Sequence, residues 1–173
     1  MNHWEKLQHK IVSSVTAKTI CSSWLEDDKE VVFTNGCFDL LHKGHVSYLA
    51  QAADEGHFLV VGLNSDASVK RQGKGEERPI NDEQARAAVL AGLSFVHLVV
   101  IFDEDTPLNL IKELTPSVLV KGADYDANET DETAKTYIVG SKEVKENQGR
   151  VVTIPLEEGF STTNIVNRMK KGM

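Results

Sequence analysis

Two histidines three residues apart, His42 and His45, are the residues of this sequence best suited to chemistry. They flank Gly44 and follow a run of β-forming residues at positions 31–33, so a strand-to-helix turn is expected around them. Glycine lets the backbone approach a phosphate closely, and the start of the following helix offers N–H donors and a partial positive charge. Imidazole N–H groups can donate to phosphate oxygens as negative charge builds up. The pattern predicts a phosphate-transfer site. The alternative is that the two histidines are only surface or helix-capping residues.

A second anion site is predicted near the C-terminus, where Gly159 precedes Ser161, Thr162 and Thr163. Gly159 permits a tight entry into a last helix, which we expect to begin near Ser161 or Thr162. Hydroxyl and backbone N–H groups at a helix start can hold phosphate oxygens. The segment is therefore a candidate anion cradle, whose hydroxyls could also serve only as helix caps.

Apolar runs alternate with helix-type spacing along most of the chain. The expected strands and helices are strands 31–33, 58–63, 96–102, 117–120 and 151–154, and helices 44–55, 82–93, 106–114 and 161–169. Thr106 is the expected N-cap of its helix, with Pro107 at the first helical position. Strands that are apolar throughout and separated by helices indicate a parallel sheet covered on both faces. We predict an α/β fold, a doubly wound parallel five-stranded sheet, with ligands beyond the carboxyl ends of the strands where strand order reverses.

The N-terminal part of the chain is expected to form a helical arm. Residues 3–26 have the apolar spacing of one or two amphipathic helices, and the charged stretch 26–30 follows them. We therefore expect an N-terminal helical arm at residues 1–27 and one domain at residues 28–173.

Composition is that of an ordinary globular protein, with 40% hydrophobic and 26% charged residues. A net charge of −7 argues against broad binding to nucleic acid or to an anionic membrane. The two cysteines, Cys21 and Cys37, are too few for a secreted disulfide scaffold, and we find no signal peptide or membrane-length apolar run. We expect a cytoplasmic protein with reduced thiols. A zinc site would have to use Cys37 and His57 beside the two histidines, a spacing that matches no familiar metal pattern.

The segment 34–45, T-x-G-x-F-D followed by H-x-G-H, resembles the signature of the cytidylyltransferase-like nucleotidyltransferase superfamily. The G-x-S-T-T segment at 159–163 resembles the loop that closes over the nucleotide phosphates in that superfamily. The resemblance implies a Rossmann-like fold and transfer of a nucleoside monophosphate with release of pyrophosphate. It implies that His42 and His45 donate to the α- and β-phosphates in the transition state. Mg²⁺ would be the cofactor, carried by the nucleotide phosphates.

The resemblance also implies roles for further residues. A mobile lysine after the second strand, Lys70 or Lys74, would close on the triphosphate from a glycine-containing loop, in which Arg71 is expected on a solvated face. The implied nucleotide-binding residues are Thr34, Asn35, Gly36, Phe38, Gly44, His45, Arg86, Gly159, Ser161, Thr162 and Thr163. The implied residues on the sugar-phosphate side are Asp39, Arg78, Lys121, Gly122 and Asp124, of which Asp124 could also be only a turn residue.

A narrower resemblance concerns the substrate. The segments that carry it are 35–39, 64–69, 78–81, 86–90, 120–125, 140–144 and 158–163. Together they resemble the D-glycero-β-D-manno-heptose 1-phosphate adenylyltransferases of the bacterial ADP-heptose pathway, over about residues 28–170 and not over the first 27. Leu156 stands where glycerol-phosphate cytidylyltransferases carry an arginine, which favours ATP over CTP. Ala123 replaces a glycine of the family's K-G-G-D-Y segment.

This resemblance implies ATP and a sugar phosphate as substrates and a homodimer as the assembly. In many relatives this domain is fused to a sugar kinase. Because this chain has no segment of kinase length, we expect a stand-alone form with a separate kinase upstream.

Three other functions remain open. The first is a CTP-dependent cytidylyltransferase that acts on glycerol 3-phosphate or another alcohol phosphate. The second is a nucleotide-binding sensor without catalysis, which would not need both histidines and the Ser-Thr-Thr segment. The third is a flavin-binding or redox α/β domain, which should carry a G-x-G-x-x-G turn after the first strand; this chain lacks one.

Overall fold

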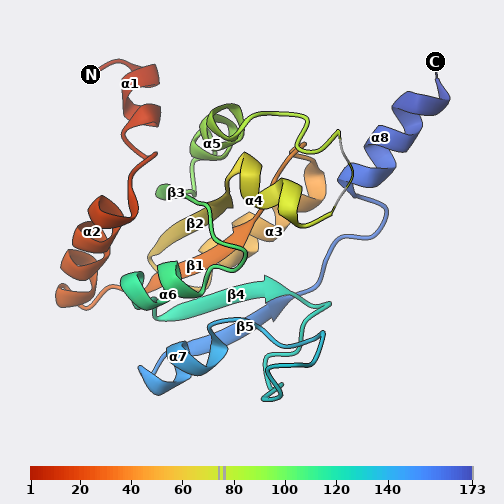
Figure 1. Ribbon diagram of the computed structural model, residues 1–173. Helices are drawn as coiled ribbons and strands as arrows, with labels where there is room; N and C mark the ends of the chain where they lie inside the picture. The colour runs from red at the N-terminus through yellow and green to blue at the C-terminus, as the bar shows by residue number, and fades with distance from the viewer. Residues whose placement is uncertain (74, 76, 173) are drawn as a thin grey trace.

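The sheet is parallel and doubly wound in the computed structural model, which describes residues 1–73, 75 and 77–172. Its strands are β1 (Val31–Gly36), β2 (Phe58–Asn64), β3 (Leu98–Phe102), β4 (Val118–Gly122) and β5 (Arg150–Ile154). They lie in the order β3-β2-β1-β4-β5, and every pairing is parallel (Figure 1). The chain runs outward from β1 to β3 and then returns to the other side of β1 for β4 and β5. The predicted five-stranded sheet is confirmed.

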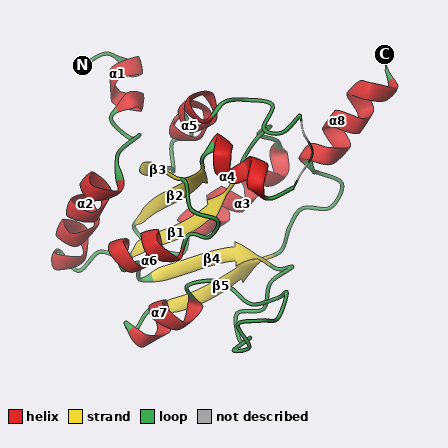
Figure 2. Ribbon diagram, viewed as in Figure 1, coloured by secondary structure: helices red, strands yellow, loops and turns green. Residues whose placement is uncertain are grey.

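Helices cover both faces of this sheet (Figure 2). They are α1 (His3–Gln8), α2 (Ser14–Glu26), α3 (Lys43–Ala53), α4 (Asp66–Arg71), α5 (Glu83–Ala91), α6 (Leu108–Leu114), α7 (Ser141–Glu146) and α8 (Thr162–Lys171). Helices α3 and α5 pack on one face, with α1 against α5, and α2, α6 and α7 pack on the other. Helix α8 extends away from the sheet (Figure 1). None of the helices that the structure describes has the length and apolar character needed to cross a membrane.

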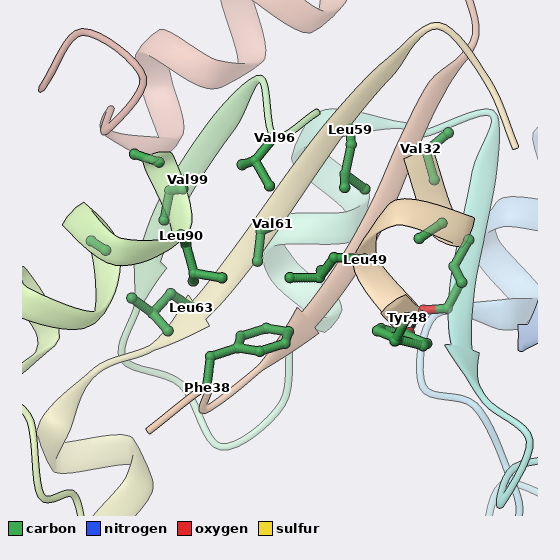
Figure 3. Packing of buried hydrophobic residues seen from close by; sticks show 14 of the residues in the cluster. Val32, Phe38, Tyr48, Leu49, Leu59, Val61, Leu63, Leu90, Val96 and Val99 are labelled. Carbon is green, nitrogen blue, oxygen red and sulfur yellow. Dashed lines mark hydrogen bonds between the residues drawn. The ribbon is translucent and has the colours of Figure 1, made fainter. Parts of the chain in front are cut away.

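The core consists of two apolar clusters, one on each face of the sheet. Alternate residues of a strand point to opposite faces, so Val32 belongs to one cluster and Phe33 to the other. On the first face Leu49 of α3 and Leu90 of α5 lie over Val61 of β2 (Figure 3). Because the central strands are buried on both faces, their sequences are apolar throughout rather than alternating.

Two short helices and one cap differ from the sequence predictions. Helices α4 and α7 were not predicted, and Lys70 and Arg71 form the last turn of α4 instead of a loop. The expectation for Thr106 is wrong: the N-cap of α6 is Pro107, which makes no side-chain cap hydrogen bond. Lys74 lies outside the described residues.

The N-terminal segment forms two helices, α1 and α2, within the predicted range, and both are tied to the sheet. The backbone between them runs beside β3, where the N–H of Val12 donates to Val99 O at 3.0 Å and the N–H of Val99 donates to Lys10 O at 2.8 Å. Ala17 and Cys21 of α2 are fully buried, and burial raises the pKa of the Cys21 thiol to about 11. Both helices therefore contribute to the core packing that supports the strands.

Candidate active site

A cleft of about 570 Å³ opens at the carboxyl ends of the strands, where β1 separates β2 from β4. The connection after β1 leads to α3 on one face of the sheet and the connection after β4 leads to α7 on the other, so the loops that follow these two strands diverge and leave room for a ligand. The cleft is lined by residues of both predicted motifs: His42, His45, Ser161 and Thr162. Two segments that are far apart in the sequence thus share one site.

His42 has a defined tautomer because it caps helix α3. Its Nδ1 accepts a hydrogen bond from the backbone N–H of His45 at 3.3 Å. A ring nitrogen can accept only when it carries no proton, and burial lowers the pKa of His42 below its ordinary value of 6.5. Neutral His42 therefore carries its proton on Nε2, and this N–H is left to donate to a ligand in the cleft.

His45 is held between two aromatic rings. Its imidazole stacks on that of His42 with the ring centroids 3.7 Å apart, and it meets the ring of Phe38 edge-on at 5.3 Å. Phe38 has a left-handed backbone, with φ at 43°, which a bulky residue adopts only where its surroundings hold it there. Burial of the Phe38 side chain provides that hold. The Phe38 ring thus supports His45, whose ring in turn packs on that of His42.

Gly44 lies close to two neighbouring side chains. A Cβ at this position would lie 3.1 Å from His42 Nδ1 and 3.1 Å from the Cβ of Phe160. Lys43 lies next to it, with Nζ 5.2 Å from the centre of the Phe160 ring and in an ion pair with Glu157. These contacts hold the segment before α8 against the start of α3.

The start of α8 faces the cleft. Ser161 is the N-cap, and its Oγ accepts the backbone N–H three residues further on at 3.0 Å. The hydroxyl of Thr162 donates to Leu40 O at 3.4 Å and so links α8 to the loop after β1. Gly159 supplies a left-handed turn, with φ at 83°, at the entry to this segment. Gly159 and Thr163 are not among the described residues that line the cleft.

Lys121 places a positive charge at the end of β4. Its Nζ donates to Asn35 Oδ1 at 2.5 Å and lies 5.6 Å from the centre of the Tyr125 ring. Burial lowers the pKa of Lys121 to about 8, and the nearby Asp124 carboxylate opposes this shift. A Cβ at Gly122 would approach Asp124 Oδ1 to 2.6 Å, so any side chain at this position would displace the Asp124 carboxylate. Lys121, Gly122 and Asp124 all line the cleft.

Asp39 and Arg78, expected on the sugar-phosphate side, bond to each other and are not among the described lining residues. The buried Asp39 carboxylate accepts the backbone N–H groups of Ile80 at 2.8 Å and Asn81 at 3.1 Å. Burial alone would raise the pKa of Asp39, but these hydrogen bonds and the Arg78 guanidinium hold it below its ordinary value. The structure therefore makes Asp39 a support for the loop that precedes α5.

Arg86, expected to bind the nucleotide, is also absent from the described lining of the cleft. Its side chain is fully buried and donates to Cys37 O at 2.7 Å, Asn64 O at 2.8 Å and Asn81 O at 3.0 Å. It also forms an ion pair with Asp66 at 2.6 Å. Arg86 thus fixes the ends of β1 and β2 relative to each other, which positions the loops of the site.

Two other predicted residues lie off the cleft. Thr34 is fully buried, and its hydroxyl is 2.8 Å from the hydroxyl of Tyr48, which donates to Val120 O at 3.1 Å. Burial raises the pKa of Tyr48, so it stays a neutral hydrogen-bonding group. Tyr48 lines the cleft and links β1, α3 and β4 at the point where strand order reverses. Lys70 is exposed in the last turn of α4 and is not among the described lining residues.

The sequence model of the cytidylyltransferase-like family matches residues 33–168, which include both motifs of the cleft. The chain belongs to the cytidylyltransferase-like family. The nucleotidyltransferase superfamily that the two motifs indicated is thereby confirmed.

Curated members of this group named bifunctional protein HldE are similar to the chain. The identity is 56% over 163 residues for the protein of Campylobacter concisus and 53% over 163 residues for that of Rhodospirillum rubrum. Both alignments cover 94% of this chain and 31% of the relative, so the chain spans about a third of the length of these relatives. An alignment of that extent must include part of the first 27 residues. The expectation that those residues carry none of the resemblance is therefore wrong.

Solved structures share the fold of this cytidylyltransferase-like chain. A lipopolysaccharide core biosynthesis protein from Thermoplasma volcanium superposes with a TM-score of 0.56 at 25% identity, covering 75% of this chain and 97% of that protein. Pantoate-β-alanine ligase from Francisella tularensis superposes with a TM-score of 0.60 at 14% identity, covering 92% of this chain and 76% of that one. The second likeness concerns the fold alone.

Sequence reasoning missed many residues that line the cleft in this family member. Besides Tyr48 they include Asn64, Gln72, Asp105, Thr106, Pro107, Tyr125, Tyr137 and Val139. Most of them lie on the loops that follow β2, β3 and β4 rather than in a motif. The rule that ligands bind at the carboxyl ends of parallel strands was the available signal, since it points to these loops.

Proposed function

We propose that this chain transfers the AMP moiety of ATP to a sugar 1-phosphate and releases pyrophosphate. The observation that carries the proposal is the single cleft lined by the His42–His45 pair and by Ser161 and Thr162 at the start of α8. Donors from two distant segments suit a ligand with several phosphate groups better than one with a single phosphate. Membership of the cytidylyltransferase-like family supports nucleotidyl transfer as the type of reaction.

In the proposed mechanism an oxygen of the acceptor phosphate attacks the α-phosphorus of ATP in line. A new P–O bond forms while the bond to the bridging oxygen breaks, and the electron pair leaves with pyrophosphate. Phosphate oxygens are already ionised near neutral pH, so the reaction needs no strong base. Catalysis then depends on positioning and on stabilisation of negative charge.

The cleft residues divide these tasks. The Nε2–H of His42 and the imidazole of His45 would donate to the α- and β-phosphates as charge develops. The N–H groups at the start of α8, with Ser161 and Thr162, would hold the β- and γ-phosphates. Lys121 would neutralise part of the combined charge of the two substrates. Lys70 or Lys74 stays a predicted further contact to the triphosphate.

Mg²⁺ is the proposed cofactor. No group of three or more His, Cys, Asp or Glu side chains within the described parts of the chain is arranged to hold a metal ion. Mg²⁺ commonly takes one or two carboxylates and fills its remaining positions with phosphate oxygens and water. Asp124 lines the cleft and could supply such a ligand, which fits a metal that arrives with the nucleotide.

For the substrates we propose ATP and D-glycero-β-D-manno-heptose 1-phosphate. Leu156 lines the cleft at the position where glycerol-phosphate cytidylyltransferases carry an arginine, which favours ATP. The similarity to the HldE relatives supports the heptose acceptor, and their name states two functions, of which this chain would carry one. The upstream sugar kinase, the homodimer and the cytoplasmic location stay predictions.

A pyrophosphate-release assay tests the proposal. The purified chain is given ATP or CTP with either D-glycero-β-D-manno-heptose 1-phosphate or glycerol 3-phosphate, and we expect release with ATP and the heptose. His45→Ala should lower turnover by about 10²-fold or more without unfolding the protein, the scale of a lost oxyanion donor. His9→Ala is the matched control, because His9 is exposed at the end of α1, and it should retain the wild-type rate.

Other outcomes would change the assignment. Release with CTP and glycerol 3-phosphate alone would favour the cytidylyltransferase. Tight ATP binding without release for any acceptor would favour a nucleotide sensor. A wild-type rate in His45→Ala would contradict the role given to the paired imidazoles.

A further inference from the structure

Helix α8 has little apolar packing and is attached to the rest of the protein by polar contacts near its two ends. None of its described residues is buried. At its start the Thr162 hydroxyl donates to Leu40 O at 3.4 Å. In its last turn the Lys170 ammonium donates to Glu77 Oε1 at 3.0 Å. Because apolar burial contributes little here, these contacts determine the direction in which the helix points.

The two contacts of α8 end on loops that are joined to each other. Glu77 precedes Arg78, which forms an ion pair with the buried Asp39. Asp39 in turn precedes Leu40, whose carbonyl group accepts the Thr162 hydroxyl. The loop after β1 and the loop before α5 are therefore connected, and α8 is attached to both of them.

The two attachment points lie far apart along the helix. Thr162 is the first of the ten residues of α8 and Lys170 the ninth, so they are about 12 Å apart along the axis. The contact at Thr162 alone would let the helix pivot about its start. The second contact fixes the direction of the axis, and with it the direction of the N–H groups beside Ser161 that face the cleft.

The Lys170–Glu77 pair is charged, specific and open to water. The hydrogen bond from Lys170 holds the pKa of the Glu77 carboxyl below its ordinary value, so Glu77 is ionised near neutral pH. Arg168 and Lys171 lie in the same turn, but neither forms an ion pair with a described side chain. The side chains of Lys170 and Glu77 are 64% and 55% exposed, and exposed ion pairs contribute little to folding stability. Loss of the pair should therefore change the placement of α8 and leave the fold intact.

We propose that Lys170 is a positioning residue for the triphosphate: its ion pair with Glu77 sets the direction of α8 and keeps the N–H groups at the start of this helix aimed into the cleft. This rests on the proposed function and deepens it. Lys170 is not among the described residues that line the cleft, so it acts through the helix. The β- and γ-phosphates are held by α8 both before and during the reaction, so the pair contributes to the binding of ATP and not to kcat.

The test reverses the charge of one partner and then of both. In Lys170→Glu two carboxylates face each other, so KM for ATP in the pyrophosphate-release assay, and Kd for MgATP by calorimetry, should rise about three- to tenfold. Both kcat and KM for the sugar phosphate should stay within about twofold of the wild-type values, with Tm unchanged. Glu77→Lys should show the same defect. The double variant restores the pair with opposite polarity and should return KM for ATP to within about twofold of the wild type.

Lys171→Glu is the matched control. It makes the same change of charge at the next residue of the helix, on an exposed side chain outside the pair, and should leave KM for ATP unchanged. The defect of Lys170→Glu should also shrink at high salt, because exposed charges are screened.

The outcomes distinguish this inference from the function on which it rests. A wild type that neither binds ATP nor releases pyrophosphate would overturn both. A wild type that binds ATP without releasing pyrophosphate, and binds it more weakly as Lys170→Glu, would overturn the proposed function alone. Unchanged ATP binding in Lys170→Glu, an equal loss in Lys171→Glu, or a double variant as defective as the single ones would overturn the positioning role.

Discussion

Replacing His42 separates the two tasks that the structure gives to one side chain. Nδ1 of His42 caps helix α3, and Nε2–H is left to donate to the phosphates. Loss of an N-cap costs about 1 kcal/mol of the free energy of unfolding, and the 3.3 Å length of this bond places it toward the weak end. Loss of an oxyanion donor lowers turnover by about 10²- to 10³-fold, or about 2.7–4 kcal/mol of transition-state stabilisation.

Two substitutions at this position should therefore diverge in stability and agree in rate. His42→Ala removes both groups, so Tm should fall by about 2–4 °C for a chain of this size, and kcat by about 10²- to 10³-fold. His42→Asn retains a good N-cap residue but cannot reach the phosphates as the imidazole does. Its Tm should stay near that of the wild type while kcat falls as far as in His42→Ala.

Thermal unfolding monitored by circular dichroism and the initial rate of pyrophosphate release provide the two readouts. A His42→Asn variant with near wild-type turnover would refute the donor role of Nε2. Equal losses of Tm in both variants would refute the capping role. An unchanged Tm and rate in His42→Ala would remove His42 from the site altogether.

Four further predictions concern His42 and neighbouring groups. Gly44→Ala should lower kcat by about ten- to a hundredfold in the release assay, because its Cβ would lie 3.1 Å from His42 Nδ1 and from Phe160 and would displace one of them; an unchanged rate would show that the contact is not critical. In the pH profile, kcat/KM should fall below pH 6.5, where His42 gains a proton and its Nδ1 can no longer accept a hydrogen bond. It should also fall above about pH 8, where Lys121 loses its charge. If the decrease on the basic side does not move to higher pH in Lys121→Arg, this assignment is contradicted. Because the pKa of His42 is lowered in the folded state, the unfolded chain binds a proton at His42 more readily than the folded chain. The free energy of unfolding should therefore decrease as the pH falls below 6.5. Arg86→Leu should lower the free energy of unfolding by about 3–5 kcal/mol in urea titrations, because three carbonyl groups and a carboxylate lose the buried guanidinium that donates to them; a change below about 1 kcal/mol would contradict the network.

The fold could be predicted from the sequence wherever an element was long or uniformly apolar. Strands such as residues 58–63 are buried on both faces and therefore leave a continuous apolar run. Helices α4 and α7 have six residues each, less than two turns, so apolar spacing cannot distinguish them from loops. The cap of α6 was wrongly assigned to Thr106 because several residues near a helix start satisfy the same pattern, and the backbone path decides among them.

The site could be predicted where a motif coincided with an element boundary. His42, His45 and Ser161 lie at the starts of α3 and α8, and the rule for parallel sheets brings both starts to one edge. Asp39 and Arg86 carry the residue types of ligand-binding groups, but their partners are backbone groups of distant loops, which no local pattern contains. For the same reason the loop residues that line the cleft became visible only in three dimensions.

The most direct measurement of the central claim is a crystal structure of the chain with a non-hydrolysable ATP analogue and Mg²⁺. We expect the triphosphate to lie in the cleft, with donors from His42 and His45 on its α- and β-phosphates and the first N–H groups of α8 on its β- and γ-phosphates. A triphosphate bound outside this cleft, or in contact with the imidazoles and distant from the start of α8, would contradict the account.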